Sequence, residues 1–384
     1  MSEQAAPLRG IRVLSVAEQY PGPLCAQLLA DLGAEVIQLE RPGGDPARRM
    51  NPWLFRACNA NRRSIVLDLK DERSRPAVQA LIRRSSVFLE GYRPGVARRL
   101  GIDYPAVSAI QPSIVYCSIS GFGQDGPASS IIGHNINFEA IAGALDPFAR
   151  GADPASYFVR PVPFGDVMSG CLSALGIVAA LRSAEATGAG SYLDISITES
   201  LLVALAPEVT RALNGGGGWN TYEAAYGIFR TADGYIALGV AYEENFWQSL
   251  CDALEAPALR EFNHEARLSF ADDVRAELQN RLERKDTAEW MALFGDQVPG
   301  TPVHLLSEVA DDAHLRHRGV ITEARAEDGR LFRTVLTPFA RSGDGPPSAL
   351  TVEALGASTA EVLRAAGLTA EEIATAEGLS HGPG

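Results

Sequence analysis

The chain has 384 residues, of which 46% are apolar and 21% are charged, and its formal net charge is −13. This length predicts two packed units, the net negative charge argues against a surface that wraps nucleic acid, and we find no continuous apolar run of the roughly 18–20 residues that span a bilayer. The five cysteines are scattered and lack C-x-x-C spacing, so we expect free thiols in a reducing cytoplasm and no structural zinc.

The first half of the chain alternates between β-rich and helical stretches. "IRVLSV" (11–16) is a predicted strand, and after a turn and a helix "EVIQLE" (35–40) is the next. Strand–helix–strand units of this length build parallel sheets with right-handed crossovers, so this half is predicted to be doubly wound α/β. The same rhythm predicts further strands at 64–70, 86–92 and 113–123, and a helix at 73–84.

The second half predicts a long helix, a boundary and a hairpin. A helix rich in small residues is expected over 170–188, with Gly188 as its C-cap, and a strand and a helix follow. The loop "NGGGGW" (214–219) is the clearest candidate boundary, and Asp233-Gly234 marks the turn of a hairpin. Several helices are expected up to about residue 325. We therefore predict a large domain over 1–213, a small domain over 220–325, and a linker with C-terminal helices over 326–384.

Arginines lie beside Gly, Pro or Asn in segments that end or follow strands. They are Arg41, Arg62, Arg63 and Arg93, and Tyr92 precedes the last of them. Loops after the carboxyl ends of strands form the ligand crevice of open α/β sheets, so these residues are candidates for a cationic pocket that binds phosphate groups. The alternative is that the arginines only solubilise surface loops. The chain has neither G-x-G-x-x-G after its first strand nor a P-loop motif, which disfavours a nicotinamide dehydrogenase or a P-loop nucleotidase.

Three segments carry residues capable of proton transfer. His134 stands in "GHNINF", and it is either a proton carrier or a core histidine. Asp166 lies in "RPVPFGDVMSG", just ahead of the predicted long helix, where it is either catalytic or an N-cap. Glu243 and Glu244 follow the hairpin, and from the residues alone they are exposed charges that open a helix.

Taken together, these segments resemble the family III CoA-transferases (CaiB/BaiF), which include formyl-CoA transferase, carnitine CoA-transferase and α-methylacyl-CoA racemase. The resemblance covers nearly the whole chain and includes "LRGIRVLSVAEQYPGPLCAQLLADLGAEVIQLERPGGDP", "NRRSIVLDLK", "IVYCSISGFGQDGP" and the closing "GASTAEVL". It implies a large Rossmann-like domain built from both termini, a smaller inserted α+β domain, and an interlocked homodimer. It also implies coenzyme A as an acyl thioester on the arginine loops, with no metal, nicotinamide or flavin.

The resemblance also implies roles for the three candidate groups. In the transferases the aspartate that matches Asp166 is a nucleophile, whereas in the racemase branch it is one of two acid/base groups that flank the α-carbon. His134 matches the second group of the racemase branch, and Glu243 is the best match for the glutamate that supports it. Asn135 and Phe138 depart from the aspartate and tyrosine of the racemase pattern.

Three functions follow from these observations. The first is racemisation or epimerisation of a 2-methylacyl-CoA, in which two bases serve opposite faces of one carbon. The second is transfer of CoA between carboxylic acids through an aspartyl-CoA intermediate on Asp166. The third is CoA binding without catalysis, or with different chemistry.

Overall fold

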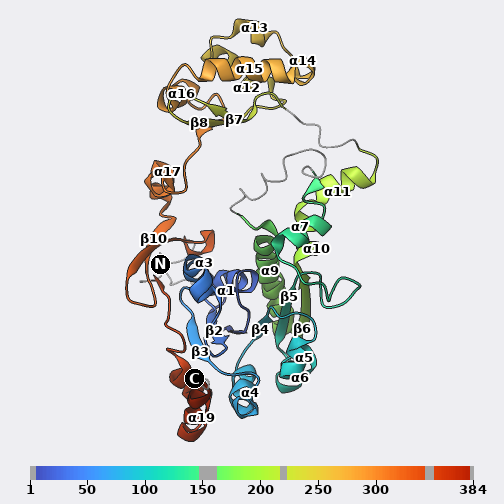
Figure 1. Ribbon diagram of the computed structural model, residues 1–384, viewed down its shortest axis with the longest axis vertical. Helices are drawn as coiled ribbons and strands as arrows, with labels where there is room; N and C mark the ends of the chain where they lie inside the picture. The colour runs from blue at the N-terminus through green and yellow to red at the C-terminus, as the bar shows by residue number, and fades with distance from the viewer. Residues whose placement is uncertain (1–5, 147–161, 217–222, 342–349, 381–384) are drawn as a thin grey trace. The chain divides into compact units, whose positions relative to one another are not determined.

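The structure is a computed structural model that describes residues 6–146, 162–216, 223–341 and 350–380 (Figure 1). The chain forms two compact units. Unit 1 comprises Met1–Val209 together with Gly319–Gly384, and unit 2 comprises Thr210–Arg318. The larger unit is therefore built from both ends of the chain. The boundaries at 213, 220 and 325 remain predictions.

Unit 1 is organised around a parallel sheet of six strands in the order β3-β2-β1-β4-β5-β6. This is the strand order of the Rossmann fold, and it confirms the predicted doubly wound α/β class. The order reverses between β1 and β4, where Val13 of β1 pairs with Val36 on one side and Val87 on the other. A ligand crevice is expected at the carboxyl ends of these two strands. The strands are β1 (Arg12–Ser15), β2 (Glu35–Glu40), β3 (Arg63–Val66), β4 (Val87–Glu90), β5 (Val115–Ser120) and β6 (Ser191–Ser196).

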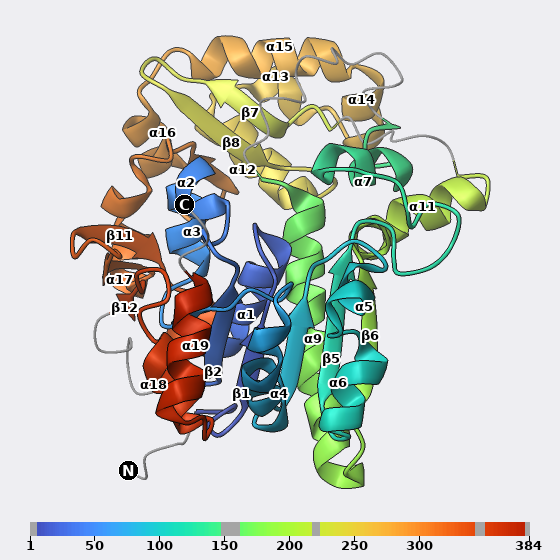
Figure 2. The ribbon, with the colours of Figure 1, turned by 60° about the horizontal axis from the view of Figure 1, so that its bottom comes forward.

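Helices cover both faces of this sheet, and each face has its own apolar core. One core contains α1 and α9, and the other contains α4, α6 and the two C-terminal helices α18 and α19, which lie beside the strands (Figure 2). The helices are α1 (Pro21–Asp31), α2 (Ala47–Met50), α3 (Pro52–Cys58), α4 (Arg75–Arg83), α5 (Val96–Leu100), α6 (Tyr104–Ile110), α7 (Asn135–Ile141), α9 (Phe164–Thr187), α10 (Ile197–Ala204), α11 (Ala206–Leu213), α18 (Thr359–Ala365) and α19 (Ala370–Ser380), with short turns η1 (Glu72–Ser74) and η4 (Pro338–Arg341).

The long helix α9 begins at Phe164, six residues before its predicted start at 170, and ends at Gly188 with φ 72° as expected. Its N-cap is Pro163, so Asp166 lies inside the first turn and is not the N-cap. By length and composition α9, with a mean hydropathy of 1.7, is apolar enough to cross a membrane, a test that the core helix of a folded domain also passes. Its uncharged stretch, residues 167–181, is shorter than a membrane-spanning run. In unit 1 it packs against α1, β5 and β6, and a Cβ at Gly170 would come within 2.9 Å of the carbonyl oxygen of Pro21.

A small sheet of unit 1 corrects one prediction. Helices were expected up to about residue 325, but Ile321–Arg325 forms the strand β10, which pairs with β11 (Leu331–Val335) and β12 (Leu350–Thr351). Apolar side chains of this sheet, among them Ala324 and Leu350, pack in one cluster with Phe55.

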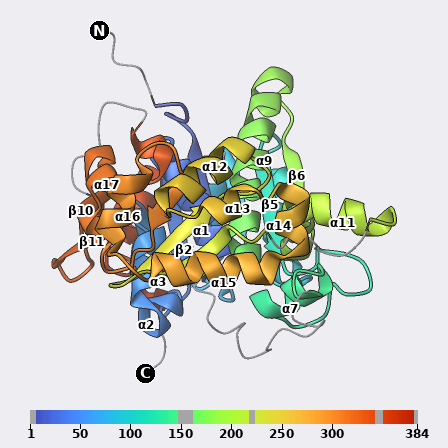
Figure 3. The same cartoon turned by 90° about the horizontal axis from the view of Figure 1, so that it is seen from above.

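Unit 2 is a small α+β unit with a core around Trp247 and Trp290. The predicted hairpin is present as β7 and β8, and β9 pairs with β8 to complete an antiparallel sheet. Figure 3 shows the helices α12 to α15 gathered together. The elements are β7 (Tyr226–Arg230), β8 (Tyr235–Gly239), β9 (Gly300–Pro302), α12 (Glu244–Ala253), α13 (Pro257–Arg260), α14 (His264–Ser269), α15 (Ala271–Leu282), α16 (Thr287–Phe294), η3 (Val309–Asp311) and α17 (Ala313–Arg318). Part of the glycine-rich loop, residues 217–219, lies outside the described residues.

Candidate active site

A cavity of about 550 Å³ opens at the carboxyl ends of β1, β4 and β5, where the strand order predicts a ligand crevice. Its walls come from the loops after these three strands, from the start of α7 and from the start of α9. Four of the residues singled out in the sequence line it, namely Tyr92, Arg93, His134 and Asp166. The fold thus brings His134 and Asp166 to one cavity although 31 residues separate them in the chain.

His134 immediately precedes α7, and its side chain is exposed. Its backbone N–H donates to Oδ1 of Asn137 at 2.9 Å, which anchors the first turn of α7. Phe138, one turn further on, is buried instead, and it lies so close to Gly121 that a Cβ there would come within 2.3 Å of the ring. Within unit 1 Phe138, and not His134, therefore fills the core at this point.

Asp166 is half-buried in the first turn of α9. Burial raises the pKa of its carboxyl to about 6, and the nearby carboxylate of Glu139 contributes to the rise. A carboxyl group with this pKa exists in both protonation states near neutral pH, which suits a group that both takes and returns a proton.

A second cavity, of about 480 Å³, shares Glu18 and Tyr92 with the first. It is lined by three basic side chains, those of Arg41, Lys70 and Arg99. Arg41 was expected in a cationic pocket, whereas Lys70 and Arg99 were missed. Lys70 lies a few residues beyond the end of β3, as Arg41 follows β2, and this position is the signal that could have identified it.

Arg62 and Arg63 line neither of the two cavities. The strand β3 begins at Arg63, so both arginines lie at the amino end of that strand, away from the carboxyl ends where the cavities open. Arg62 is 4% exposed, and its guanidinium donates to Oδ1 of Asn59 at 2.9 Å and to the backbone carbonyls of Pro23 and Cys58. Burial lowers the pKa of Arg62 to about 10. Arg63 instead pairs with Glu361 at 2.6 Å. In this structure the two arginines hold segments of unit 1 together.

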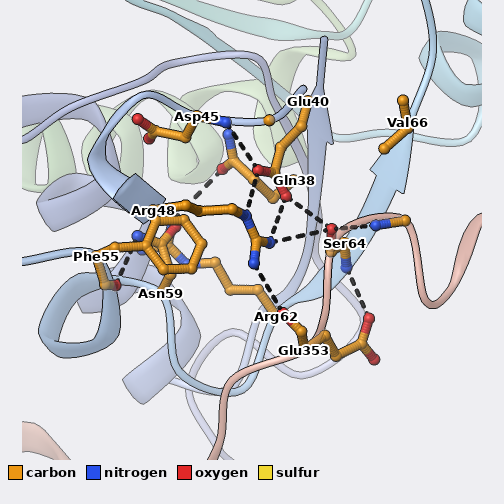
Figure 4. A network of polar contacts seen from close by, with 12 residues as sticks. Gln38, Glu40, Asp45, Arg48, Phe55, Asn59, Arg62, Ser64, Val66 and Glu353 are labelled. Carbon is orange, nitrogen blue, oxygen red and sulfur yellow. Dashed lines mark hydrogen bonds and ion pairs between the residues drawn. The ribbon is translucent and has the colours of Figure 1, made fainter. Parts of the chain in front are cut away.

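A buried ion pair positions one wall of the cavity (Figure 4). Arg48 makes a bidentate contact of 2.7 Å per bond with Glu40, whose side chain is fully buried. Glu40 also accepts the backbone N–H of Asp45 at 3.0 Å, and Asp45 accepts that of Gln19 at 3.0 Å. Gln19 lines the cavity with φ 72°, a left-handed conformation that is uncommon for a residue with a side chain. The ion pair therefore supports the loop that follows β1.

Glu243 and Glu244 lie in unit 2 at the start of α12. Glu244 contacts Nη1 of Arg267 through both carboxylate oxygens at 3.0 Å, and the side chain of Arg267 is 2% exposed. The carboxylate of Glu243 accepts the backbone N–H of Ala241 at 3.3 Å. Glu244 thus has a structural partner in its own unit, and a pairing of Glu243 with His134 remains a prediction. In the described parts of the chain, no cluster of His, Cys, Asp or Glu could hold a metal ion.

The chain is similar to known proteins over most of its length. The family described as CoA-transferase family III matches residues 8–351. Succinyl-CoA:glutarate CoA-transferase of Mus musculus is 32% identical, over 83% of this chain and 76% of that protein. Alpha-methylacyl-CoA racemase of Homo sapiens is 30% identical, over 95% of each chain. The crystal structure of a CAIB/BAIF family protein from Brucella suis superposes with a TM-score of 0.80 at 26% identity, covering 94% of this chain and all of that one.

Proposed function

The chain belongs to CoA-transferase family III, and from this membership we propose that it racemises or epimerises a 2-methylacyl-CoA at the carbon next to the thioester carbonyl. The observation that carries the proposal is that His134 and Asp166 line one cavity. Racemisation needs two groups that act on opposite faces of a single carbon, and an imidazole and a carboxyl group of raised pKa suit that task.

Coenzyme A would bind across the two cavities that share Glu18 and Tyr92. We assign its phosphate groups to Arg41, Lys70, Arg93 and Arg99, which offer charge-assisted hydrogen bonds in a chain of net negative charge. Arg62 and Arg63 take no part in this assignment, because their guanidinium groups already have partners within unit 1.

The reaction would proceed by removal and return of one proton. One of the two groups takes the α-proton, the electron pair moves onto the thioester oxygen as an enolate, and the other group gives its own proton to the opposite face. The product is the thioester with inverted configuration at the α-carbon, and His134 and Asp166 have exchanged protonation states. Each group could contribute about 10²–10⁴-fold to the rate. Glu243 would orient the imidazole.

The first backbone N–H groups of α9 face the cavity end of the helix and would be candidates to bind the enolate oxygen. However, the N–H of Gly165 already donates to Oδ1 of Asn135 at 3.0 Å. The N–H of Val167 donates to the carbonyl of Pro163 at 3.1 Å. We therefore assign the helix an electrostatic role, in which its positive end favours negative charge beside Asp166.

A second candidate function is transfer of CoA between carboxylic acids, and the names of several relatives favour it. Here the Asp166 carboxylate attacks the thioester carbonyl and expels CoA as the thiolate, which leaves a mixed anhydride. The thiolate then attacks the aspartyl carbonyl and releases the first acid, so that CoA is held as an aspartyl thioester. An incoming carboxylate attacks the aspartyl thioester carbonyl and expels the CoA thiolate, which leaves a new mixed anhydride. The thiolate then attacks the acyl carbonyl of that anhydride, which releases the new acyl-CoA and the free Asp166 carboxylate.

One experiment separates the two functions. The enzyme is incubated in D₂O with a 2-methylacyl-CoA as the only substrate, and deuterium at the α-carbon is measured by mass spectrometry. Racemisation predicts deuterium uptake without a second acid, whereas transfer predicts none. A parallel sample with an added dicarboxylic acid and hydroxylamine would trap an aspartyl adduct at Asp166 if transfer occurs. Asp166→Asn is the control for both arms, since it removes the group that both mechanisms use.

A further inference from the structure

The side chain of Asn135 joins the start of α7 to the start of α9. Its Oδ1 accepts the backbone N–H of Gly165 at 3.0 Å and that of Asp166 at 3.4 Å. Its Nδ2 donates to Oε1 of Glu139 at 2.8 Å. The two ends of the amide are thus used in opposite senses, one as an acceptor and one as a donor. An ionised aspartate of the same length could only accept.

The contact depends on a glycine at the start of α9. A Cβ added to Gly165 would lie 2.9 Å from Oδ1 of Asn135 and 2.8 Å from Cγ2 of Ile197. Any side chain at this position would therefore push Asn135 away from the backbone that it binds. Asn135 makes the hydrogen bond, and Gly165, which has no Cβ, leaves room for it.

The bridge also places a buried charge beside Asp166. Glu139 is 1% exposed, and its carboxylate disfavours ionisation of Asp166, so that it adds to the effect of burial. The amide of Asn135 lies between the two acids without adding a third charge. The other charged or titratable groups that line this cavity are His134 just ahead of α7, Tyr20 ahead of α1, and Glu18, Tyr92 and Arg93 on the cavity wall.

We propose that Asn135 is a positioning residue which fixes the first turn of α9, and with it Asp166, at the cavity and which holds Glu139 beside that turn. The proposal rests on the proposed role of Asp166 in catalysis. Replacing the amide by an acid of the same shape would remove the donor to Glu139 and put three carboxyl groups together. Replacing Glu139 by glutamine would keep an acceptor for Asn135 and remove a charge.

The test is a titration of the Asp166 carboxyl in the whole protein without substrate. Protein labelled with ¹³C at the aspartate carboxyl carbon is titrated by NMR, and Asp166→Asn identifies the resonance. We expect Asn135→Asp to raise the pKa of Asp166 and Glu139→Gln to lower it, each by about one unit. The double variant Asn135→Asp/Glu139→Gln exchanges one charge for another and should titrate close to the wild type. Glu199→Gln, an exposed change on α10, should leave the titration unchanged.

The same variants are then followed in the reaction. The acidic limb of the pH profile of kcat/KM for deuterium uptake should move in the same direction as the NMR titration, with kcat changed more than KM. An Asp166 resonance that titrates identically in the wild type, Asn135→Asp and Glu139→Gln would overturn the proposal, provided that circular dichroism shows each variant folded. Because the titration needs no turnover, shifted titrations in an enzyme without deuterium uptake would reject racemisation and leave the role of Asn135 standing.

Discussion

The Nε atom of Arg41 lies 3.1 Å from Oε1 of Glu18, and Glu18 lines both of the cavities that we assign to CoA. Burial raises the pKa of Glu18 to about 7, even though Arg41 opposes the rise. In the free protein, Glu18 is thus a counter-ion for an arginine that we assign to a phosphate group of CoA. A phosphate that binds Arg41 must compete with this carboxylate.

This competition predicts that replacing Arg41 and replacing Glu18 change the affinity for CoA in opposite directions. Arg41→Gln should weaken CoA binding by about 1–3 kcal/mol, because one charge-assisted bond is lost. Glu18→Gln should strengthen binding, and it should reduce the gain in affinity that the wild type shows as the pH falls through 7 and Glu18 takes up a proton. Isothermal titration calorimetry with CoA at pH 6 and pH 8 measures both effects. Arg49→Gln, an exposed change that lines neither cavity, is the control, and equal affinities for Arg41→Gln and Arg49→Gln would refute the assignment.

The two adjacent glutamates of unit 2 should respond differently to the same change. Glu243→Gln should slow deuterium uptake while leaving stability unchanged, because we assign this carboxylate to the orientation of His134. Glu244→Gln should lower the free energy of unfolding, since it removes the charge that faces the buried guanidinium of Arg267. Rates and urea unfolding curves are measured for both variants. A Glu243→Gln enzyme with the wild-type rate would remove Glu243 from the mechanism.

The Glu40–Arg48 ion pair should be important for stability. Arg48→Ala leaves Glu40 buried without its partner, and a broken buried pair costs about 3–5 kcal/mol. Arg49→Ala, the next residue of α2 and an exposed one, should change stability by no more than about 0.5 kcal/mol. Urea denaturation of the two variants is the measurement. Arg48→Ala should also weaken CoA binding by the protein that remains folded, because the contacts from Glu40 through Asp45 to Gln19 on the cavity wall lose their anchor.

Glu90 predicts a pH dependence of stability. It lies buried at the end of β4, accepts the N–H of Tyr92 at 2.7 Å and bonds to the hydroxyl of Ser118. Burial raises its pKa from 4.5 to about 7. Between these two pH values the unfolded chain releases the proton while the folded chain keeps it, so stability falls as the pH rises.

The contribution of Glu90 is isolated by comparison with Glu90→Gln. The difference in unfolding free energy between wild type and variant should change by up to about 3 kcal/mol between pH 4.5 and pH 7, and then stay constant. Urea unfolding across this range measures it. Glu18 and Asp166 have raised pKa values too, but they are present in both proteins and cancel in the difference. A difference that does not vary with pH would contradict the assignment.

The sheet of unit 1 could be predicted because its strands are short, apolar and separated by helical patterns. Each of the five strands expected in the first half is present, and so are the hairpin and the Gly188 cap. The start of α9 was missed because Pro163 and Gly165 are residues typical of turns. What permits helix there is a contact with Asn135, thirty residues earlier in the chain, and local sequence does not reveal such a contact.

The prediction that Arg62 and Arg63 share a cationic pocket with Arg41 failed for a similar reason. Arg62 and Arg41 look alike in sequence, since each is flanked by loop-forming residues. Only the folded chain brings the carbonyls of Pro23 and Cys58 around Arg62, and only α5 brings Arg99 to the cavity of Arg41. His134 and Asp166 were identified because each stands in a recognisable motif, and the fold then places them on the same cavity.

The measurement that tests the account most directly is the stereochemical course of the reaction in D₂O. A 2-methylacyl-CoA of a single configuration at the α-carbon is incubated with wild type, His134→Ala and Asp166→Ala, and substrate and inverted product are separated before deuterium is measured. We predict that the wild type gives inverted product with one deuterium at the α-carbon. Both variants should lose inversion in either direction while still binding CoA. The proposed racemisation would be contradicted by a wild-type enzyme that incorporates no deuterium into several such thioesters but transfers CoA to an added carboxylic acid. His134→Ala would then be expected to slow transfer only about tenfold, or roughly 1.4 kcal/mol.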